Sequence, residues 1–247
     1  MHANALLLTG LSDAHASYQL APGVQVQTRV GEAFLRLQAA AAQAGFDLVA
    51  VSGFRSFARQ RAIWNRKFTG ELPLLSRHET PLAAMDLPEV ARVTAILAWS
   101  ALPGTSRHHW GTDIDIVDAH AHGPNETATL TLASTQFGGA YFALHQWLDE
   151  ALPAFGFYRP YDRDRGGVAT EPWHISFAPL AAGYAAALNP AVWAATCATE
   201  DLAGKTAVLA QLPTLFAQYV HNVAPLPADL RQTVSPDFVV PDFESQP

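Results

Sequence analysis

The stretch SRHHWGTDID, residues 106–115, organises the expected fold and its chemistry. It leads from a glycine-containing loop into residues 113–118, where polar and apolar residues alternate as in a strand. Side chains repeat every second residue along a strand, so Asp113 and Asp115 share one face. A second stretch, EPWH, residues 171–174, adds a carboxylate and an imidazole. Together the two stretches contain the ligands of a catalytic zinc site, which takes three protein ligands and leaves one position for water.

The composition bounds the class of protein. The chain has 247 residues, of which 49% are hydrophobic, and this is enough for one substantial core. Only 15% are charged, and 15 basic residues against 22 acidic ones give a net charge of −7. A nucleic-acid binder would carry a basic stripe, and an anionic surface is not attracted to acidic lipids. We therefore expect neither nucleic acid nor a membrane as a partner.

The single cysteine and the N-terminal segment bear on the compartment. Cys197 is the only cysteine, so neither a disulfide framework within the chain nor a cysteine-rich structural zinc site is possible. Alanine-rich sequence around Cys197 favours a buried small residue over a nucleophile. The first residues lack Lys and Arg, their apolar run at 5–8 is short for a signal peptide, and no stretch is long enough for a membrane span. The expected compartment is the cytoplasm.

Periodicity and breaker residues predict an α+β domain from about residue 20 to 180, followed by a mostly helical extension. Residues 1–23, 71–88 and 119–139 have little regular pattern, and 161–167 form a charged turn. An alanine-rich helical region runs from 179 to about 211, and the tail from 212 is expected to be loop. The predicted strands are 24–30, 46–54, 113–118, 155–158 and 171–178, and the predicted helices are 32–44, 57–68, 89–100 and 141–152.

The first stretch by itself has two interpretations. A loop-to-strand return would aim His108 and Asp115 at one point, leaving Asp113 for a supporting imidazole or for the rim of the site. Alternatively, the two aspartates are only the polar face of an amphipathic strand. Glu171 shifts the balance: a carboxylate buried beside Trp173 has a raised pKa and can act as a general base near His174.

Three blocks carry a family resemblance. Ser106-x-His108-x-x-Gly111-x-x-x-Asp115, followed by Glu171-x-Trp173-His174, resembles the VanY/VanX-type zinc D,D- and L,D-carboxypeptidases of peptidase family M15. A third block, SGFRSF at 52–57 with Gln60, is similar to a strand-to-helix segment of that family. The resemblance spans about residues 30–180. It implies the M15/hedgehog-like peptidase fold, a small antiparallel sheet flanked by helices, with residues 1–180 as the catalytic domain and 181–247 as a mostly helical extension packed on it.

The resemblance also implies roles for individual residues. One zinc ion per chain would be held by His108, Asp115 and His174. Glu171 would be the catalytic base, and Arg55 the cation that faces the scissile carbonyl. The candidate substrate-binding residues are Gln60, Ser106, Tyr158, Trp173 and Asp113.

Five further positions need comment. Asp113 stands where the family usually has a small residue such as alanine, and we expect it at the pocket rim. Phe54 replaces a tyrosine. His109 is a rival ligand to its neighbour His108, whereas His120 and His122 lie in a loop without a third ligand.

The expected function is a zinc carboxypeptidase that removes the terminal D-alanine from peptidoglycan stem peptides. The preferred hypothesis is an L,D-carboxypeptidase that converts recycled tetrapeptide muropeptides to tripeptides, because that reaction spares wall precursors in the cytoplasm. The alternative is a D,D-carboxypeptidase acting on pentapeptides. A less favoured alternative is a non-catalytic zinc- or peptide-binding module, which would have no use for a base at Glu171.

Overall fold

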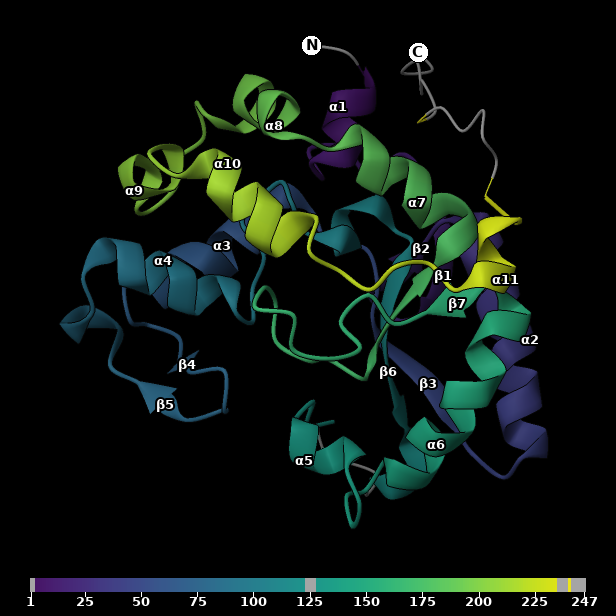
Figure 1. Cartoon of the computed structure of the whole chain (residues 1–247). Helices are drawn as coiled ribbons and strands as arrows, with labels where there is room; N and C mark the ends of the chain where they lie inside the picture. The colour runs from purple at the N-terminus through teal and green to yellow at the C-terminus, as the bar shows by residue number, and fades with distance from the viewer. Residues whose placement is uncertain (1–2, 123–127, 235–239, 241–247) are drawn as a thin grey trace.

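A four-stranded antiparallel sheet is the centre of the computed structural model, which describes residues 3–122, 128–234 and 240 (Figure 1). Its strand order is β3–β6–β8–β7, and each neighbouring pair is antiparallel. The bounds are β3 Leu48–Ser52, β6 Asp113–Asp118, β7 Phe157–Tyr158 and β8 His174–Phe177. The expected α+β fold with a small antiparallel sheet is confirmed.

Strand β6 lies in the interior of the sheet, and all six of its residues are buried. Ile114 and Ile116 point into a hydrophobic cluster that includes Phe34 of α2 and Leu148 of α6. These two helices, Thr28–Gln43 and Phe142–Ala151, lie beside the sheet in Figure 1. Because successive side chains of a strand point to opposite faces, Asp113 and Asp115 point away from this cluster.

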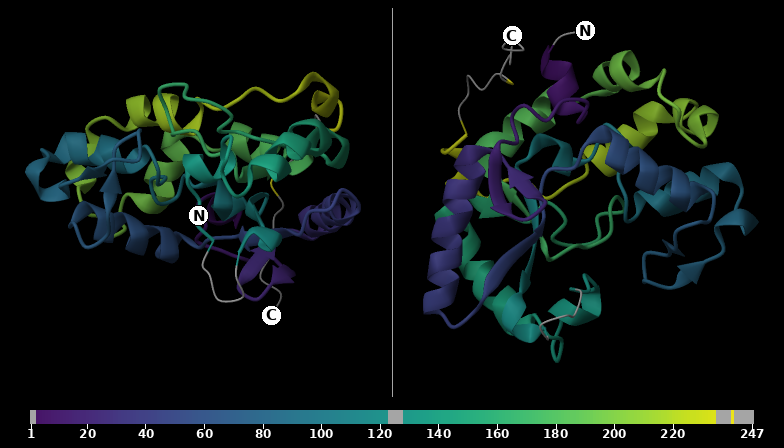
Figure 2. Two further views of the ribbon diagram at one scale, coloured as in Figure 1. Left: turned by 90° about the horizontal axis from the view of Figure 1, so that it is seen from below. Right: turned by 180° about the vertical axis from the view of Figure 1, so that it is seen from behind.

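A second hydrophobic cluster joins helices from both ends of the chain. Trp64 of α3 and Val93 of α4 share it with Trp193 and Val208 of the C-terminal helices. Trp64 also donates its indole N–H to the Ala203 carbonyl at 3.0 Å. Seen from behind, α3 and α4 lie across the sheet from α2 (Figure 2). The helices concerned are α3 Phe57–Phe68, α4 Glu89–Leu97, α7 Ala178–Ala187, α8 Pro190–Cys197, α9 Lys205–Leu209 and α10 Leu212–Leu215.

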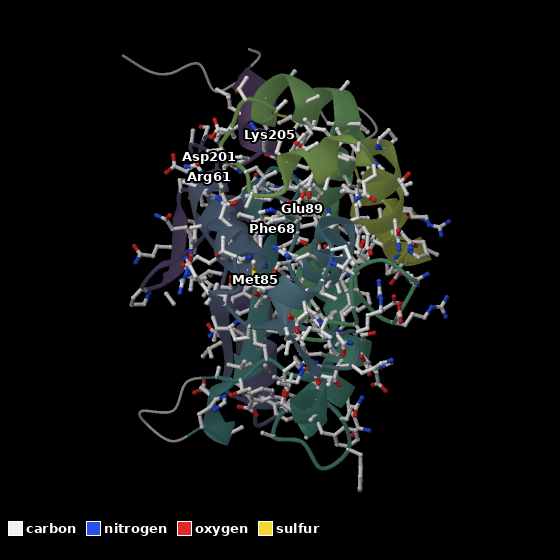
Figure 3. All side chains as sticks on the ribbon, turned by 90° about the vertical axis from the view of Figure 1, so that its left-hand side faces the viewer. Arg61, Phe68, Met85, Glu89, Asp201 and Lys205 are labelled. Atoms are coloured by element: carbon white, nitrogen blue, oxygen red, sulfur yellow. The ribbon has the colours of Figure 1, made fainter. Side chains whose placement is uncertain are left out.

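An ion pair on the surface also joins α3 to the segment before α9. Arg61 lies 2.7 Å from a carboxylate oxygen of Glu200. Figure 3 faces this side of the molecule and labels Arg61 and Phe68 of α3 with Asp201 and Lys205 of the C-terminal part. Helices α7 to α10 therefore pack on the same core as α3, the helix that carries Gln60.

The expected strand at 24–30 is wrong in its second half. β2 ends at Val26, where it pairs with Tyr18, and α2 begins at Thr28. Val30 belongs instead to the helical pattern that follows, because it is buried on the same face of α2 as Phe34 and Leu37. Gly31 lies within α2, where an added Cβ would come within 2.3 Å of the Tyr18 ring.

Both ends of the chain have more regular structure than expected. Residues 1–23, expected as loop, contain α1 Ala3–Leu8 and β1 Tyr18–Ala21, which pairs with β2 Val24–Val26. The tail, also expected as loop, contains α10, a π-helical turn Phe216–Val220 and α11 Ala228–Arg231. Proline in the first turn of α10 is compatible with a helix because the N–H of that position has no intrahelical partner.

The remaining expectations differ mainly at element ends. β7 begins at residue 157 and β8 at 174, so Glu171 precedes its strand. Residues 123–127 of the expected loop, and 235–239 and 241–247 of the expected extension, lie outside the described residues. In the part of the chain that is described, no helix combines the length and apolar character needed to cross a bilayer. The short elements are β4 Leu74–Leu75, β5 Pro81–Leu82, α5 Leu132–Thr135 and the 3-10 turns Ala84–Asp86, Arg107–Trp110, Ala119–Ala121 and Leu152–Phe155.

Gly10 determines how closely the segment after α1 approaches His109. Its φ is +72°, and an added Cβ would lie 2.3 Å from Nδ1 of His109. Gly23 has a similar φ of +76° but no atom within 4 Å of the added Cβ. We expect Gly10→Ala to lower the free energy of unfolding by about 1–3 kcal/mol more than Gly23→Ala, because overpacking adds to the shared backbone strain. Urea unfolding measures both, and equal losses would show that His109 moves aside without cost.

Candidate active site

The junction between β3 and α3 holds the loop that carries the two adjacent histidines. Ser56 caps α3 by accepting a hydrogen bond from the Arg59 N–H at 3.2 Å. Just before it, the Arg55 N–H donates to the His108 carbonyl at 3.1 Å. The carbonyls of Gly53 and Arg55 accept from Nδ1 of His108 and of His109, at 2.9 and 2.6 Å. Two blocks separated by about fifty residues in sequence are thus bound together directly.

The three predicted metal ligands meet beside the sheet. Asp115 and His174 are cross-strand partners on β6 and β8. Oδ1 of Asp115 lies 3.1 Å from Nδ1 of His174, and Oδ2 lies 3.3 Å from Nε2 of His108. One ligand atom from each residue lies within 4.8 Å of the others, and all three residues are buried. The structure therefore brings His108, Asp115 and His174 together as the sequence predicted.

The hydrogen bonds on the far sides of the two imidazoles favour a metal between them. Nδ1 of His108 contacts the Gly53 carbonyl, which can only accept, so this nitrogen carries a proton and Nε2 keeps its lone pair toward Asp115. Nε2 of His174 contacts an oxygen of Asp113 at 2.9 Å, so Nδ1 is its nitrogen on the site side. Two imidazole nitrogens and a carboxylate oxygen around one point fit the donor set of a catalytic zinc site.

The two histidines of the ligand cluster (His108, Asp115 and His174) differ in how readily they take up a proton. Burial is the largest effect on His174, yet its hydrogen bonds to Asp113 and Asp115 outweigh it and raise the pKa of His174 to about 9. Burial lowers the pKa of His108, and Asp115 only partly opposes it. Burial alone would raise the pKa of Asp115, but the two histidines hold it well below its ordinary value. In the metal-free protein a proton therefore lies on His174, and a bound metal ion would replace it at Nδ1.

Glu171 lies beside the cluster without belonging to it. Its Oε2 is 3.8 Å from Nδ1 of His174, and its side chain is 13% exposed. Burial raises the pKa of Glu171 to about 7, with Asp115 adding to the rise and the charges of His174, Arg55 and Lys67 opposing it. A carboxylate with such a pKa can accept and return a proton near neutral pH.

Arg55 is held in place by its neighbours. Its guanidinium donates to the Gln60 amide oxygen at 2.9 Å and to the Ser52 hydroxyl at 3.4 Å. Burial lowers the pKa of Arg55, while Asp115 and Glu171 oppose the change. Because the ordinary pKa of arginine is so high, the side chain stays a cation at neutral pH. Its position beside both carboxylates fits the role implied by the resemblance.

A pocket of about 240 Å³ lies over the ligand cluster, that is, over His108, Asp115 and His174. Its volume is smaller than that of pockets that enclose a whole drug-sized ligand, so it fits the end of a larger molecule. Two of the predicted substrate-binding residues, Ser106 and Trp173, line it with Arg55 and Glu171.

Gln60 and Tyr158 occupy other places than expected. Gln60 is fully buried and connects Arg55 to the Ala101 carbonyl, so it supports the pocket wall from behind. Tyr158 accepts a hydrogen bond from Arg107 and lines, with Pro172, a second pocket of about 480 Å³. Among the described residues, neither side chain lines the pocket over the ligand cluster.

The expectation that Asp113 lies at the pocket rim is wrong. Its side chain is fully buried behind His174, because Arg107, Thr112 and Ser176 surround its carboxylate with hydrogen bonds. Of the alternatives open from the sequence, the structure selects support of an imidazole. His109 is not a rival ligand either: its Nε2 accepts from the Gly104 N–H at 3.0 Å, and its Nδ1 is bonded to Arg55. Among described residues, His120 and His122 join no group of potential metal ligands.

Sequence reasoning missed three residues around the pocket. Arg107 forms a buried ion pair with Asp113 at 2.7 Å, but the motif leaves its position unspecified, so it carries no signal of its own. The Tyr161 ring lies 5.0 Å from that of His174. Lys67 donates to the Ser100 hydroxyl at 2.7 Å. Lys67 was detectable, because it follows Gln60 by seven residues and helical spacing places both on one side of α3.

Comparisons with known proteins find a family model and several relatives. The family model VanY, D-alanyl-D-alanine carboxypeptidase, matches residues 23–180, well over half of the chain. A D-alanyl-D-alanine carboxypeptidase of Enterococcus faecalis is 28% identical over 167 residues, which are 66% of this chain and 52% of that protein. A protein of Haemophilus influenzae described only as uncharacterized is 31% identical over 121 residues, which are 48% of this chain and 92% of that protein.

Two solved structures are also similar. One is a mutant of the vancomycin resistance D,D-pentapeptidase VanY in complex with Zn(II), with 27% identity, 65% of this chain and 76% of that chain covered, and a TM-score of 0.47. The other is VanYB in complex with D-alanine-D-alanine, with 26% identity, 65% and 75% of the two chains covered, and a TM-score of 0.46.

Proposed function

The chain belongs to the VanY family of D-alanyl-D-alanine carboxypeptidases, and from this we propose that it is a zinc-dependent carboxypeptidase which removes the terminal D-alanine from peptidoglycan stem peptides. The observation that carries the proposal is the buried His108, Asp115 and His174 cluster with Glu171 beside it. A module that only bound metal or peptide would not need a carboxylate with a raised pKa at this position.

The donor set suits one zinc ion per chain. His108 and His174 present imidazole nitrogens to it, and Asp115 presents a carboxylate oxygen. When bound, zinc would lower the pKa of a coordinated water and polarise the scissile carbonyl.

The remaining steps belong to the protein's own side chains. Glu171 accepts the proton of the attacking water at a carboxylate oxygen and then delivers it to the leaving amine of D-alanine. Arg55, fixed by Gln60 and Ser52, faces the oxygen that gains negative charge. An electrostatic contact of this kind contributes about 3–4 kcal/mol to stabilisation of the transition state. Ser106 and Trp173 line the space for the end of the peptide.

The pH profile follows from Glu171. The base acts only when it is deprotonated, so kcat/KM should rise with pH as Glu171 loses its proton. Its pKa is about 7 without a metal, and the positive charge of bound zinc lowers it. We therefore expect the acidic limb of the profile to have an apparent pKa at or below about 7. Initial rates across the acidic and neutral range test this, and an acidic limb clearly above neutrality would contradict the assignment of Glu171 as the base.

Two candidate peptides share the terminal D-alanine. The family description favours the D,D bond of a pentapeptide that ends in D-Ala-D-Ala. The L,D bond of a tetrapeptide is the substrate that sequence reasoning preferred, and its cleavage would belong to muropeptide recycling. Both bonds present a free terminal carboxylate and a D-alanine leaving group to the same pocket.

Mass detection of released D-alanine from the two peptides, offered side by side to the zinc-loaded protein, tests the proposal. Release from at least one is expected, and the ratio of kcat/KM values identifies the preferred bond. The same peptides with an amidated C-terminus are matched controls that a carboxypeptidase should leave uncut. Absence of release from both free peptides would refute the proposed function, and release from the pentapeptide alone would refute the L,D preference.

A further inference from the structure

Asp113 is a buried charged residue that lies behind the ligand cluster of His108, Asp115 and His174. It lies on β6 two residues before Asp115, and the same face of the strand carries both. Its side chain is fully buried. Its two oxygens accept four hydrogen bonds: at Oδ1 from Nε of Arg107 (2.7 Å) and Nε2 of His174 (2.9 Å), and at Oδ2 from the hydroxyls of Thr112 (2.6 Å) and Ser176 (3.1 Å).

Arg107 balances the charge of this carboxylate. A buried charge is costly unless it is paired and hydrogen-bonded. Arg107 pairs with Asp113 and donates further hydrogen bonds to the hydroxyls of Tyr158 and Ser176, at 3.1 and 2.7 Å. Its guanidinium carbon also lies 4.7 Å from the centre of the Trp110 ring. The Arg107–Asp113 pair therefore adds no net charge behind the ligand cluster. The hydrogen bonds and the ring contact of Arg107 fix the geometry of the pair.

The two metal-binding imidazoles are supported differently. Behind His108 stands the neutral carbonyl of Gly53. Behind His174 stands the ionised carboxylate of Asp113. A hydrogen bond to a carboxylate is stronger than one to a neutral acceptor, and it both fixes the ring and makes its other nitrogen a better donor to a metal.

We propose that Asp113, itself held by Arg107, is a positioning residue that fixes the ring and tautomer of His174 and so strengthens the metal site. This rests on the metal site of the proposed function. The competing interpretation is that Asp113 only neutralises a buried arginine. The two interpretations differ in what happens when both members of the pair are removed.

Two variants separate them. Asp113→Asn keeps the shape of the side chain but removes its charge, leaving Arg107 as an unpaired buried cation. The double variant Arg107→Met with Asp113→Ala removes both charges, and replacing a buried ion pair with apolar residues is often tolerated. If Asp113 positions His174, both variants bind zinc about 10–100-fold more weakly, because both lose the carboxylate behind His174. Mere neutralisation predicts that the double variant regains wild-type affinity.

Zinc affinity is measured by competition with a chromophoric chelator, and the visible spectrum of the Co(II)-substituted protein reports the ligand geometry. Asp118→Asn is the matched control, because it makes the same substitution on the opposite face of the same strand. The control should bind zinc within about twofold of wild type, because a loss of about 10–100-fold is expected only at residues that support a ligand.

The outcomes are distinguishable. Weaker zinc binding and an altered cobalt spectrum in both variants, with the control unchanged, support the proposal. Wild-type affinity in the double variant overturns it and leaves the proposed function intact. A wild-type protein that binds no zinc overturns the proposed function, and the inference with it.

Discussion

Replacing Glu171 with glutamine is expected to lower kcat about 10²–10⁴-fold, the usual contribution of a positioned general base. The amide has nearly the same shape but cannot take a proton from water. Glu171 is not one of the three clustered ligands, and its Oε2 is 3.8 Å from the nearest nitrogen of His174. The variant should therefore still bind one zinc ion per chain.

Turnover on peptides ending in D-alanine, together with elemental analysis of the same preparation, tests this prediction. Glu150→Gln is the matched control, because Glu150 is an exposed residue of α6 outside the pocket lining. The control should keep wild-type turnover and zinc content. A Glu171→Gln protein with near-wild-type kcat would remove the base assignment, and one that had lost its zinc would make Glu171 a ligand instead.

Replacing His108 with alanine should abolish both tight zinc binding and activity. The change removes one of three ligands and leaves Asp115 with a single imidazole partner. Loss of the metal removes several kcal/mol of transition-state stabilisation, so kcat/KM should fall by about 10³-fold or more. Chelation of zinc from the wild-type protein should reproduce the loss, and added zinc should restore the wild type only.

The control for this prediction is His120→Ala. The His120 side chain is 69% exposed and lies at the far end of β6, beside Asp118. Zinc content and kcat/KM should remain those of the wild type. If His120→Ala lost zinc while His108→Ala kept it, the ligand set derived from the first stretch would be wrong.

The elements show where local pattern fails. Alternation at residues 24–30 predicts one strand, but pairing with β1 ends at Val26, and Val30 joins the helical pattern of Phe34 and Leu37. Likewise, the prolines after residue 212 suggested loop, yet α10 has proline in its first turn. In both cases a contact or a position within the element outweighs the residue type. Long segments with one consistent period, such as α3 and β6, could be predicted from the sequence.

The site residues show a similar division. His108 and His109 are adjacent and chemically equal, so no local rule separates them. The β3–α3 junction separates them, by accepting one hydrogen bond from each ring and leaving only Nε2 of His108 beside Asp115. Gln60 was expected at the substrate, but its side of α3 is buried and it holds Arg55 instead.

The sequence by itself determined which kinds of ligand are present and in what order. It also determined that Asp113 and Asp115 share a face, because the period of a strand is a local property of the backbone. The family resemblance named Asp115 as the ligand, but only the tertiary structure shows why Asp115 and not Asp113 meets the metal-binding nitrogens. Asp115 stands opposite His174 and Asp113 opposite Ser176, and this register results from pairing between strands about sixty residues apart. Register depends on the packing of the whole sheet, and so Asp113, expected at the rim, lies behind the site with Arg107.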